Sequence, residues 1–405
     1  MREQKKQPEL RFKGFTDDWE QSKLGNLVEI KDSARISNIY WQEDGIPYLR
    51  SSDLVDYTAS GALFISKQTY NTFSSKTGSP KKGDVLFTSG GTIGIPTLKK
   101  DDSLIYVQGG SILYAKTSNS VKLDGRFLVN YFYNSRIKIY IKNSSVGGTI
   151  KHFTLMPAKK MPIIFPKKKE QQKIGEFFQK FDEAITLQQR KLELLKKLKQ
   201  GYLQQMFPTK DKVIPQLRFS IFNGDWEQVK LGNLGHVAMN KRIFKDETSS
   251  VGEIPFYKIG TFGKHADAFI SRELFEEYRA KYPYPKVGDL LISASGSIGK
   301  VVEYTGEDEY FQDSNIVWLA HDTKITNAFL KQIYQTIKWA GLEGSTIKRL
   351  YNKNILDTQI CMPSLSEQNL ISKLLTFLDD AYVLQQSKFK QQQQLKQAYL
   401  QKLFP

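Results

Sequence analysis

DWEQSKLGNL at residues 18–27 and DWEQVKLGNL at residues 225–234 differ only at Ser22 and Val229. The similarity continues on both sides of these stretches, always in the same order. PELRF (8–12) returns as PQLRF (215–219), KKGDVLFTSGGTIG (81–94) as KVGDLLISASGSIG (286–299), GGTIK (147–151) as GSTIK (344–348), EQQKI (170–174) as EQNLI (367–371) and GYLQQMFP (201–208) as AYLQKLFP (398–405). The repeats of solenoid proteins are about 20–50 residues long. This much longer period therefore indicates one domain-sized module that is present twice.

The first part of each module is predicted to be rich in strands. Short apolar and β-branched runs bounded by Gly, Asp and Ser are typical of strands. We predict strands in DVLFTS (84–89), LIYVQ (104–108), GSILYAK (110–116), DLLISAS (289–295) and NIVWLA (315–320). FLVNYFYNSRIKIYI (127–141) places apolar residues at helical spacing and is predicted to be a helix. The repeated Trp19 and Trp226 are predicted core residues, because large aromatic side chains dominate protein cores.

The second part of each module is predicted to be one long helix, over residues 169–206 and 366–403. Neither stretch contains proline, and apolar residues recur at three- and four-residue spacing along one face. The predicted packing residues are Ile174, Phe178, Phe181, Ile185, Leu192 and Leu195 in the first helix and Ile371, Leu374, Leu378, Tyr382, Leu395 and Tyr399 in the second. At a rise of about 1.5 Å per residue, each helix is roughly 55 Å long.

Duplicated units usually pack with two-fold symmetry, so the two helices are predicted to pair with each other and run antiparallel. The fold class that follows is α+β (mixed), with two globular modules separated by two long antiparallel helices in a pseudo-two-fold internal repeat. The predicted boundaries are 1–165 and 209–363 for the modules and 166–208 and 364–405 for the helices. A plain helical hairpin that only stabilises a dimer fits the same pattern, because periodicity indicates burial and not purpose.

The charge of the chain points to an anionic partner. Its formal net charge is +17, from 59 Lys and Arg against 42 Asp and Glu. Clustered Lys and Arg bind a phosphate backbone through counterion release, so nucleic acid is the first candidate, and an acidic protein or a membrane surface is the alternative. Cys361 is the single cysteine and the four histidines are scattered, so no metal site is expected. The sequence has neither an apolar secretory signal nor an apolar run long enough to span a bilayer, and we expect a cytoplasmic protein without a membrane partner.

Two glycine-rich stretches and two basic segments are the candidate DNA contacts. SGGTIG (89–94) and ASGSIGK (294–300) lack the G-x-x-x-x-G-K-[ST] pattern of a phosphate-binding loop, so a tight turn between strands is the favoured interpretation. A loop that touches the DNA backbone through its amides is the other one. GGTIKHF (147–153) and GSTIKRLYN (344–352) combine small residues with cationic and aromatic ones that suit a DNA groove. The predicted contacts are Ser89, Thr92, Lys151, His152, Ser295, Ser297, Lys300, Lys348, Arg349 and Tyr351.

No catalytic residues are predicted. The sequence has no G-x-S-x-G elbow and no repeated pair of His and carboxylate that suits general base catalysis. The Asn-Pro-Pro-aromatic motif of adenine methyltransferases is absent, and no cluster of acids and lysine suits metal-assisted nuclease chemistry. The repeated acids in DEAI (182–185) and DDAY (379–382) lie on the long helices, where solvated charge or subunit docking explains them.

The repeated motifs, taken together, resemble the DNA-specificity subunit of Type I restriction–modification systems over essentially the whole chain. The resemblance rests on the LRF…W…LG segment, the GD-[VL]-L turn motif that ends in I-G, the EQ-x-x-I helix start and the LQ-x-[ML]-FP end, each present twice. It implies that each globular module is a target recognition domain that reads one half of a bipartite, asymmetric DNA sequence.

The resemblance also implies what the remaining parts do. The long helices are spacers that set the gap between half-sites and bind two methyltransferase subunits, and motor-nuclease subunits join that assembly. The chain itself is then non-catalytic and holds no cofactor, while S-adenosylmethionine, ATP and Mg belong to the partner subunits. A stand-alone enzyme and a basic structural adaptor without sequence-specific DNA reading remain the alternatives.

Overall fold

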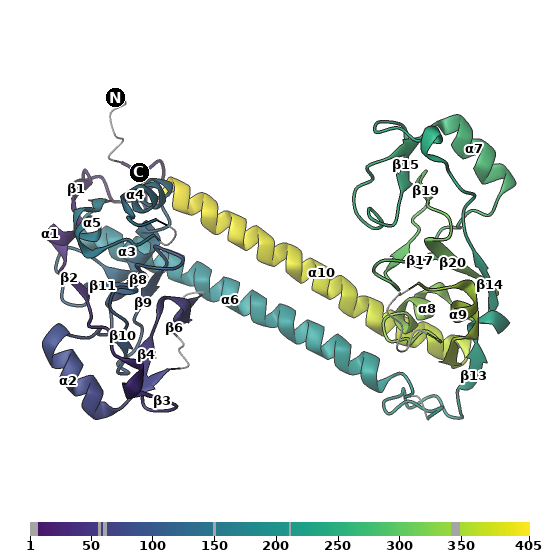
Figure 1. Ribbon diagram of the computed structural model, residues 1–405, viewed down its shortest axis with the longest axis horizontal. Helices are drawn as coiled ribbons and strands as arrows, with labels where there is room; N and C mark the ends of the chain where they lie inside the picture. The colour runs from purple at the N-terminus through teal and green to yellow at the C-terminus, as the bar shows by residue number, and fades with distance from the viewer. Residues whose placement is uncertain (1–6, 56–57, 60–62, 149–150, 210–211, 342–348) are drawn as a thin grey trace. The chain divides into compact units, whose positions relative to one another are not determined.

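The computed structural model describes residues 7–55, 58–59, 63–148, 151–209, 212–341 and 349–405. Its contacts divide the chain into two compact units (Figure 1). Unit 1 consists of Met1–Arg190 and Ser387–Pro405, and unit 2 is Lys191–Gln386. Each unit thus contains one globular module and a part of both long helices. The boundaries predicted at residues 165, 208 and 363 instead divide the chain into consecutive modules and helices.

Both predicted long helices are present. Helix α6 spans Lys168–Gln205 and helix α10 spans Leu365–Lys402. Pro166 and Pro363 lie just before the two helices, where a missing backbone N–H costs little. No helix in the described part of the chain is long and apolar enough to cross a bilayer.

Within each unit, a part of α6 packs against a part of α10, and the contacts define an antiparallel register. In unit 1, the rings of Phe177 and Tyr399 lie 5.0 Å apart, and Asp182 forms an ion pair with Lys396. In unit 2, Lys199 Nζ lies 2.5 Å from Asp379 Oδ1. The two ion pairs occupy equivalent positions of the repeat, so the first acid of each motif, Asp182 of DEAI and Asp379 of DDAY, links the two helices and is not merely solvated.

The predicted packing residues lie on the buried side of the helices, with one exception. Four are buried, namely Ile174, Phe178, Ile371 and Leu378, and seven are half-buried, namely Phe181, Ile185, Leu192, Leu195, Leu374, Tyr382 and Tyr399. The exception is Leu395, which is 48% exposed, so its predicted role can only be packing against a partner subunit and stays a prediction. The next residue, Lys396, takes the inner position because its ammonium group reaches Asp182 on α6.

The helix ion pairs allow a charge-swap test. We expect Lys199→Glu to lower the free energy of unfolding of unit 2 by about 1 kcal/mol, because a partly exposed ion pair is replaced by two like charges. Adding Asp379→Lys restores the pair in reverse and recovers most of the loss. A double-mutant cycle by urea unfolding measures this coupling. Lys197→Glu is the matched control, since Lys197 is exposed on the same helix. The same loss in the control, without recovery in the double variant, contradicts the assignment.

The globular part of unit 1 is built on two four-stranded sheets and two two-stranded ribbons, one of which pairs β5 with β6. The first sheet has the order β2-β11-β8-β9 and the second β10-β4-β7-β3, while β1 pairs with β12 (Figure 1). The strands are β1 Glu20–Lys23, β2 Ile30–Asp32, β3 Trp41–Gln42, β4 Ile46–Leu49, β5 Leu54–Val55, β6 Thr58–Ala59, β7 Phe64–Ile65, β8 Val85–Thr88, β9 Pro96–Leu98, β10 Tyr106–Val107, β11 Ile112–Ala115 and β12 Pro162–Phe165. The helices are α1 Leu24–Leu27, η1 Asn38–Tyr40, η2 Ser51–Asp53, α2 Lys67–Thr77, α3 Gly125–Tyr131, α4 Ser135–Ser144 and α5 Leu155–Lys160.

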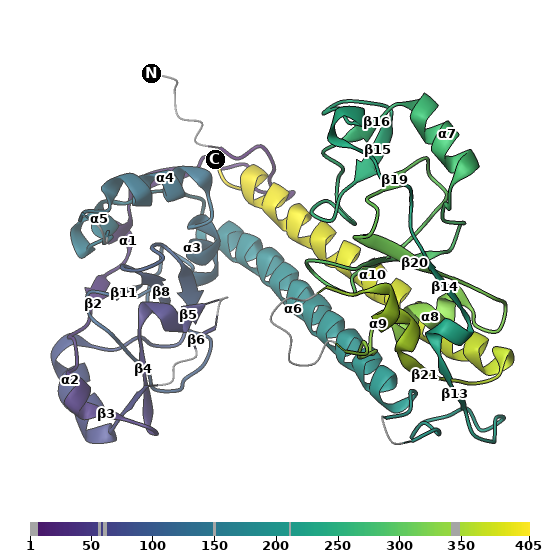
Figure 2. The ribbon, with the colours of Figure 1, turned by 45° about the vertical axis from the view of Figure 1, so that its right-hand side comes forward.

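Unit 2 repeats this topology strand for strand over most of its length. Its sheets have the orders β14-β20-β17-β18 and β16-β15-β19, and β13 pairs with β21 (Figure 2). The strands are β13 Glu227–Lys230, β14 Gly235–Ala238, β15 Ile254–Tyr257, β16 Phe269–Ile270, β17 Leu290–Ser293, β18 Val301–Glu303, β19 Tyr310–Phe311, β20 Ile316–His321 and β21 Gln359–Met362. The helices are η3 Leu231–Asn233, η4 Lys245–Glu247, α7 Arg272–Lys281, α8 Asn327–Ile333 and α9 Asn352–Asp357. The internal repeat is therefore confirmed as a structural repeat.

The predicted helix over 127–141 is wrong in one respect, because two helices, α3 and α4, occupy this stretch. The chain leaves α3 after Tyr131, and Asn134 begins the next helix. The side chain of Asn134 accepts a hydrogen bond of 2.8 Å from the backbone N–H of Arg136. Such a cap competes with continued helix at its own position.

The repeated LRF and EQ motifs meet at the start of each long helix. In unit 1, Arg11 donates two hydrogen bonds, of 2.9 and 2.7 Å, to the carboxylate of Glu170. These bonds raise the pKa of the Arg11 guanidinium. Gln171 donates to the carbonyl of Pro166 and accepts from the N–H of Asp124. In unit 2, the equivalent residues Arg218, Glu367 and Gln368 make the equivalent bonds.

The core of each unit is completed by the end of a long helix. Trp19 and Trp226 are buried, as predicted, against Phe127 and Phe329 respectively. Leu400, Leu403 and Phe404 at the end of α10 join the core of unit 1, and Met206 after α6 joins the core of unit 2. The GYLQQMFP segment (201–208) of the first repeat therefore packs in unit 2, and the AYLQKLFP segment (398–405) of the second repeat packs in unit 1.

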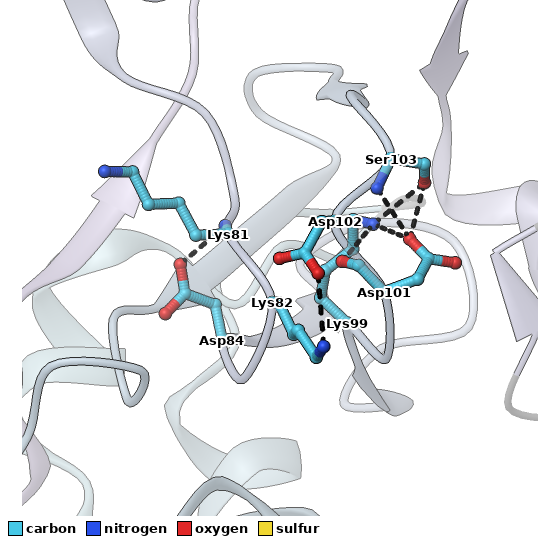
Figure 3. A network of polar contacts seen from close by, with 7 residues as sticks. All are labelled: Lys81, Lys82, Asp84, Lys99, Asp101, Asp102 and Ser103. Carbon is cyan, nitrogen blue, oxygen red and sulfur yellow. Dashed lines mark hydrogen bonds and ion pairs between the residues drawn. The ribbon is translucent and has the colours of Figure 1, made fainter.

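A polar network ties the open end of the β8–β9 hairpin (Figure 3). Lys99 is buried and donates to the backbone oxygen and carboxylate of Asp101 and to Ser103. The hydrogen bonds from Lys99 and Ser103 hold the pKa of Asp101 below its usual range. Lys82 pairs with Asp102 at 3.1 Å. These lysines serve the hairpin, and the candidate DNA contacts lie at its other end.

Candidate nucleic-acid interface

Each glycine-rich stretch forms the closed end of a hairpin. Residues 89–95 connect β8 to β9, and residues 294–300 connect β17 to β18. The hydroxyl of Thr88 donates to the carbonyl of Thr92 and accepts from the N–H of Ile95, and Ser293 makes the equivalent bonds to Ser297 and Lys300. Gly94 and Gly299 have φ of 81° and 78°, a conformation that favours glycine. The tight-turn interpretation is confirmed.

The tertiary fold places a basic segment beside each turn. In unit 1, the N–H of Phe153 donates to the carbonyl of Ser89, and His152 forms two backbone bonds with Val146. In unit 2, the N–H of Leu350 donates to the carbonyl of Ala294, and Ser295 forms a bridge with Arg349. Turn and basic segment are about 60 residues apart in sequence and form one surface in each unit.

The predicted contacts in unit 1 differ in accessibility. Thr92 and Lys151 are exposed, and His152 is half-buried. A Cβ atom at Gly90 would lie 2.9 Å from the His152 ring, so the glycine permits this close approach. Ser89 is only 2% exposed and its backbone bonds to Ser111 and to Phe153, which leaves it a structural residue of the turn and not a surface contact.

The predicted contacts in unit 2 are more heavily engaged with the protein. Ser297 and Tyr351 are exposed, and the Arg349 guanidinium stands 5.9 Å from the Tyr351 ring. Ser295 donates to Asn315, and Lys300 donates to the carbonyl of Phe262. Lys348 lies outside the described residues.

A cleft that the sequence did not indicate opens beside the first turn. It has a volume of about 690 Å³. Lys138 and Lys142 on α4 line it together with Lys151, and the remaining lining residues are Gly91, Ile93, Gly94, Ile95, Tyr133, Ile141, Ser145 and Gly148. The four-residue spacing of Lys138 and Lys142 predicts that both lie on one face of a helix. Only the tertiary structure shows that this helix, α4, lies beside the turn.

The described residues contain no group of three or more His, Cys, Asp or Glu side chains that could hold a metal ion. Cys361 is a half-buried free thiol, and burial raises its pKa. The side chains gathered at the two turns are hydroxyls, lysines, arginine and aromatic rings. Such a set suits hydrogen bonding and charge pairing with nucleic acid.

A family model for the Type I restriction modification DNA specificity domain matches residues 16–197 and 223–397. The chain belongs to this family. The two matches coincide with the two copies of the internal repeat, so the chain carries two specificity domains. The turn motifs and the basic segments beside them lie within the matched ranges, which makes them part of the specificity domains.

Related specificity subunits match different lengths of the chain. A putative type I restriction enzyme specificity subunit of Haemophilus influenzae is 55% identical over 148 residues, which are 36% of this chain and 38% of that protein. The putative MjaX specificity subunit of Methanocaldococcus jannaschii is 23% identical over 415 residues, covering 94% of this chain and 91% of that protein. The chain thus spans about two fifths of the first relative and nearly all of the second.

Solved specificity-subunit structures share the fold. The Type I restriction–modification S subunit from M. genitalium has a TM-score of 0.63 at 18% identity and covers 98% of this chain. A structure described as bearing on complex assembly and conformational transition of the type I R-M system has a TM-score of 0.55 at 17% identity. At these identities the similarity concerns the fold alone.

Proposed function

We propose that the chain is a non-catalytic, sequence-specific DNA-binding subunit that recognises a bipartite asymmetric target and positions methyltransferase and motor-nuclease subunits on it. The observation that carries this proposal is a shared scaffold with different surfaces. Both units present the same hairpin turn beside a basic segment, but His152 stands beside one turn and its counterpart in the repeat, Arg349, stands beside the other. Two similar scaffolds with different side chains suit two different half-sites.

The helices offer equivalent surfaces for partner subunits. Leu187 and Leu395 are exposed in unit 1, and Leu384 and Leu198, their equivalents in the repeat, are exposed in unit 2. Exposed apolar residues on paired helices suit docking of further helices. Two equivalent surfaces favour two methyltransferase subunits, and S-adenosylmethionine, ATP and Mg then belong to the partner subunits. The similar structure described in terms of complex assembly supports this view.

Methylome sequencing of cells that carry the chain with its methyltransferase partner tests the proposal. We expect one modified motif with two different half-sites separated by a fixed gap. Modification that does not depend on this chain would contradict the proposal. A basic adaptor would leave the motif unchanged when the chain is removed, and its own affinity for duplex DNA would lack the steep salt dependence of phosphate contacts.

The helix length sets a second expectation. Deleting 189–192 from α6 and 386–389 from α10 retains the ion pairs Asp182–Lys396 and Lys199–Asp379, one on each side of the deletions. Removing four residues shortens each helix by about 6 Å. We expect the gap in the methylated motif to shrink by about two base pairs, at about 3.4 Å each, while both half-sites stay the same.

The matched control replaces the same eight residues by alanine and keeps the helix length. Its gap should equal that of the wild type. Altered half-sites in the deletion variant, or an altered gap in the alanine variant, would show that the helices do not act as a spacer.

A further inference from the structure

We infer that the cleft beside the first turn is a binding groove for the backbone phosphates of duplex DNA. This inference rests on the proposed function and assigns a separate, sequence-independent task to one part of unit 1. The cleft of about 690 Å³ lies between the turn of the β8–β9 hairpin, helix α4 and Lys151. Lys138 and Lys142 of α4 and Lys151 thus line one cleft together with the turn, which lies about 40–60 residues earlier in the sequence.

The lysines of the cleft are free to meet an anion. Lys138, Lys142 and Lys151 are exposed, and among the described residues none of them forms an ion pair with a carboxylate. No aspartate or glutamate lines the cleft. Lys138 Nζ rests 5.4 Å from the Tyr133 ring, which orients it without neutralising its charge. The cleft is therefore a local excess of positive charge.

On helix α4, two of these positive charges lie close enough together to destabilise the helix. Lys138 and Lys142 are four residues apart, so they lie on one helix face and repel each other. Ile137 and Ile141 anchor the opposite part of the helix in the core of unit 1. Two like charges held together on an anchored helix are stabilised when an anion binds between them.

The chemistry of the lining favours phosphate over bases. The planar Arg, Asn and Gln side chains that make paired hydrogen bonds to base edges do not line the cleft, whose polar side chains are those of Lys, Ser and Tyr. Lysine is a compact, hydrated point charge that suits phosphate oxygens from many directions. Backbone contacts of this kind position a protein on DNA and carry no sequence information.

The described surroundings of the two turns differ. In unit 2, a Cβ atom at Gly299 would lie 3.1 Å from the indole nitrogen of Trp339, so a tryptophan occupies the space next to that turn. In unit 1, the equivalent Gly94 faces Ile141 of α4. The part of unit 2 that the structure describes has no helix equivalent to α4.

The test is a salt titration of DNA binding by the full chain. The probe is a fluorescein-labelled duplex of about 30 base pairs with an arbitrary sequence, and Kd is measured from about 50 to 200 mM salt. The test variant is Lys138→Gln, Lys142→Gln and Lys151→Gln combined. Each lost phosphate contact reduces the slope of log K against log salt by about 0.9, so we expect a slope shallower by about 2–3 and binding at least about tenfold weaker.

The matched control changes the same charge elsewhere in unit 1. Lys81, Lys100 and Lys122 are exposed. Lys81 lies at the opposite end of the β8–β9 hairpin (Figure 3), and Lys100 follows the end of β9 in the chain. Their combined replacement by Gln should leave the slope within about one contact of the wild type. An equal effect in both variants would mean that only net charge matters and would overturn the groove.

Two further outcomes separate this inference from the proposed function. If the wild type does not bind the duplex at all, the proposed function fails first. If the triple variant in the complex methylates an altered motif, the cleft reads bases and the inference is overturned. We expect the same motif at a reduced level of modification.

Discussion

Replacing Phe404 by alanine is expected to lower the free energy of unfolding of unit 1 by about 3–5 kcal/mol. Phe404 is 3% exposed, although it is the second-last residue of the chain. Its ring lies 5.4 Å from that of Phe127 and 6.0 Å from that of Phe178. Removing it leaves a cavity at the point where the end of α10 closes the core of the first module. Urea unfolding combined with hydrogen exchange of peptides from each unit measures the loss.

The control for Phe404 is a phenylalanine on the same helix. Phe377 is 67% exposed in unit 2, so Phe377→Ala should change the free energy of unfolding by no more than about 0.5 kcal/mol. In the Phe404 variant, we expect exchange to accelerate in peptides of β8, β11 and α3 and to stay unchanged in β17 and β20. Equal losses in the two variants would show that the end of α10 does not belong to the core of unit 1.

Replacing Arg11 by methionine is expected to lower the free energy of unfolding of unit 1 by a similar amount, about 3–5 kcal/mol. The Glu170 side chain is 2% exposed, and Arg11 is its bidentate partner. Without the guanidinium, the buried carboxylate keeps its desolvation cost and loses the charge that compensated it. Thermal unfolding of the full chain measures the effect, because unit 1 should unfold well before unit 2.

Two variants distinguish a buried ion pair from a simple change of charge. Lys167→Met removes the same charge from an exposed pair with Asp17, so its expected cost is only about 0–1 kcal/mol. Combining Arg11→Met with Glu170→Met removes both buried charges and should recover much of the loss. No recovery in the double variant would contradict the account, because the damage would then arise from lost packing of the Arg11 stem.

The equivalent ion pair in unit 2 allows the same experiment to be carried out on the second module. Arg218 bonds to Glu367 with the same geometry, at 2.7 and 2.8 Å. Arg218→Met should therefore destabilise unit 2 and spare unit 1. The LRF and EQ motifs stand about 160 residues apart in the first repeat. Their contact stabilises the start of the long helix, which explains why both motifs are present in each repeat.

Much of the architecture follows from the sequence alone. The order of the repeated motifs predicted two copies of one module, and the strand orders of the two units agree with each other. The three- and four-residue spacing predicted both long helices within one or two residues of their ends. These predictions succeed because helix periodicity and strand patterning depend on near neighbours in the chain, and because a repeated sequence has the same reasons to fold twice.

The tertiary structure decided which of two neighbouring residues is buried and which segments, distant in sequence, lie side by side. Leu395 fits the apolar pattern better than Lys396, yet the lysine is buried because Asp182 of another helix lies within its reach. Ser89 looks like a surface hydroxyl of a glycine-rich loop, but it is buried, and its backbone bonds to Ser111 and Phe153. Lys151 and the α4 lysines become one cleft only when the chain folds back to the first turn. Spacing in the sequence determines which residues share one face of a helix or strand. The segment that covers that face is distant in the sequence, so local periodicity does not predict it.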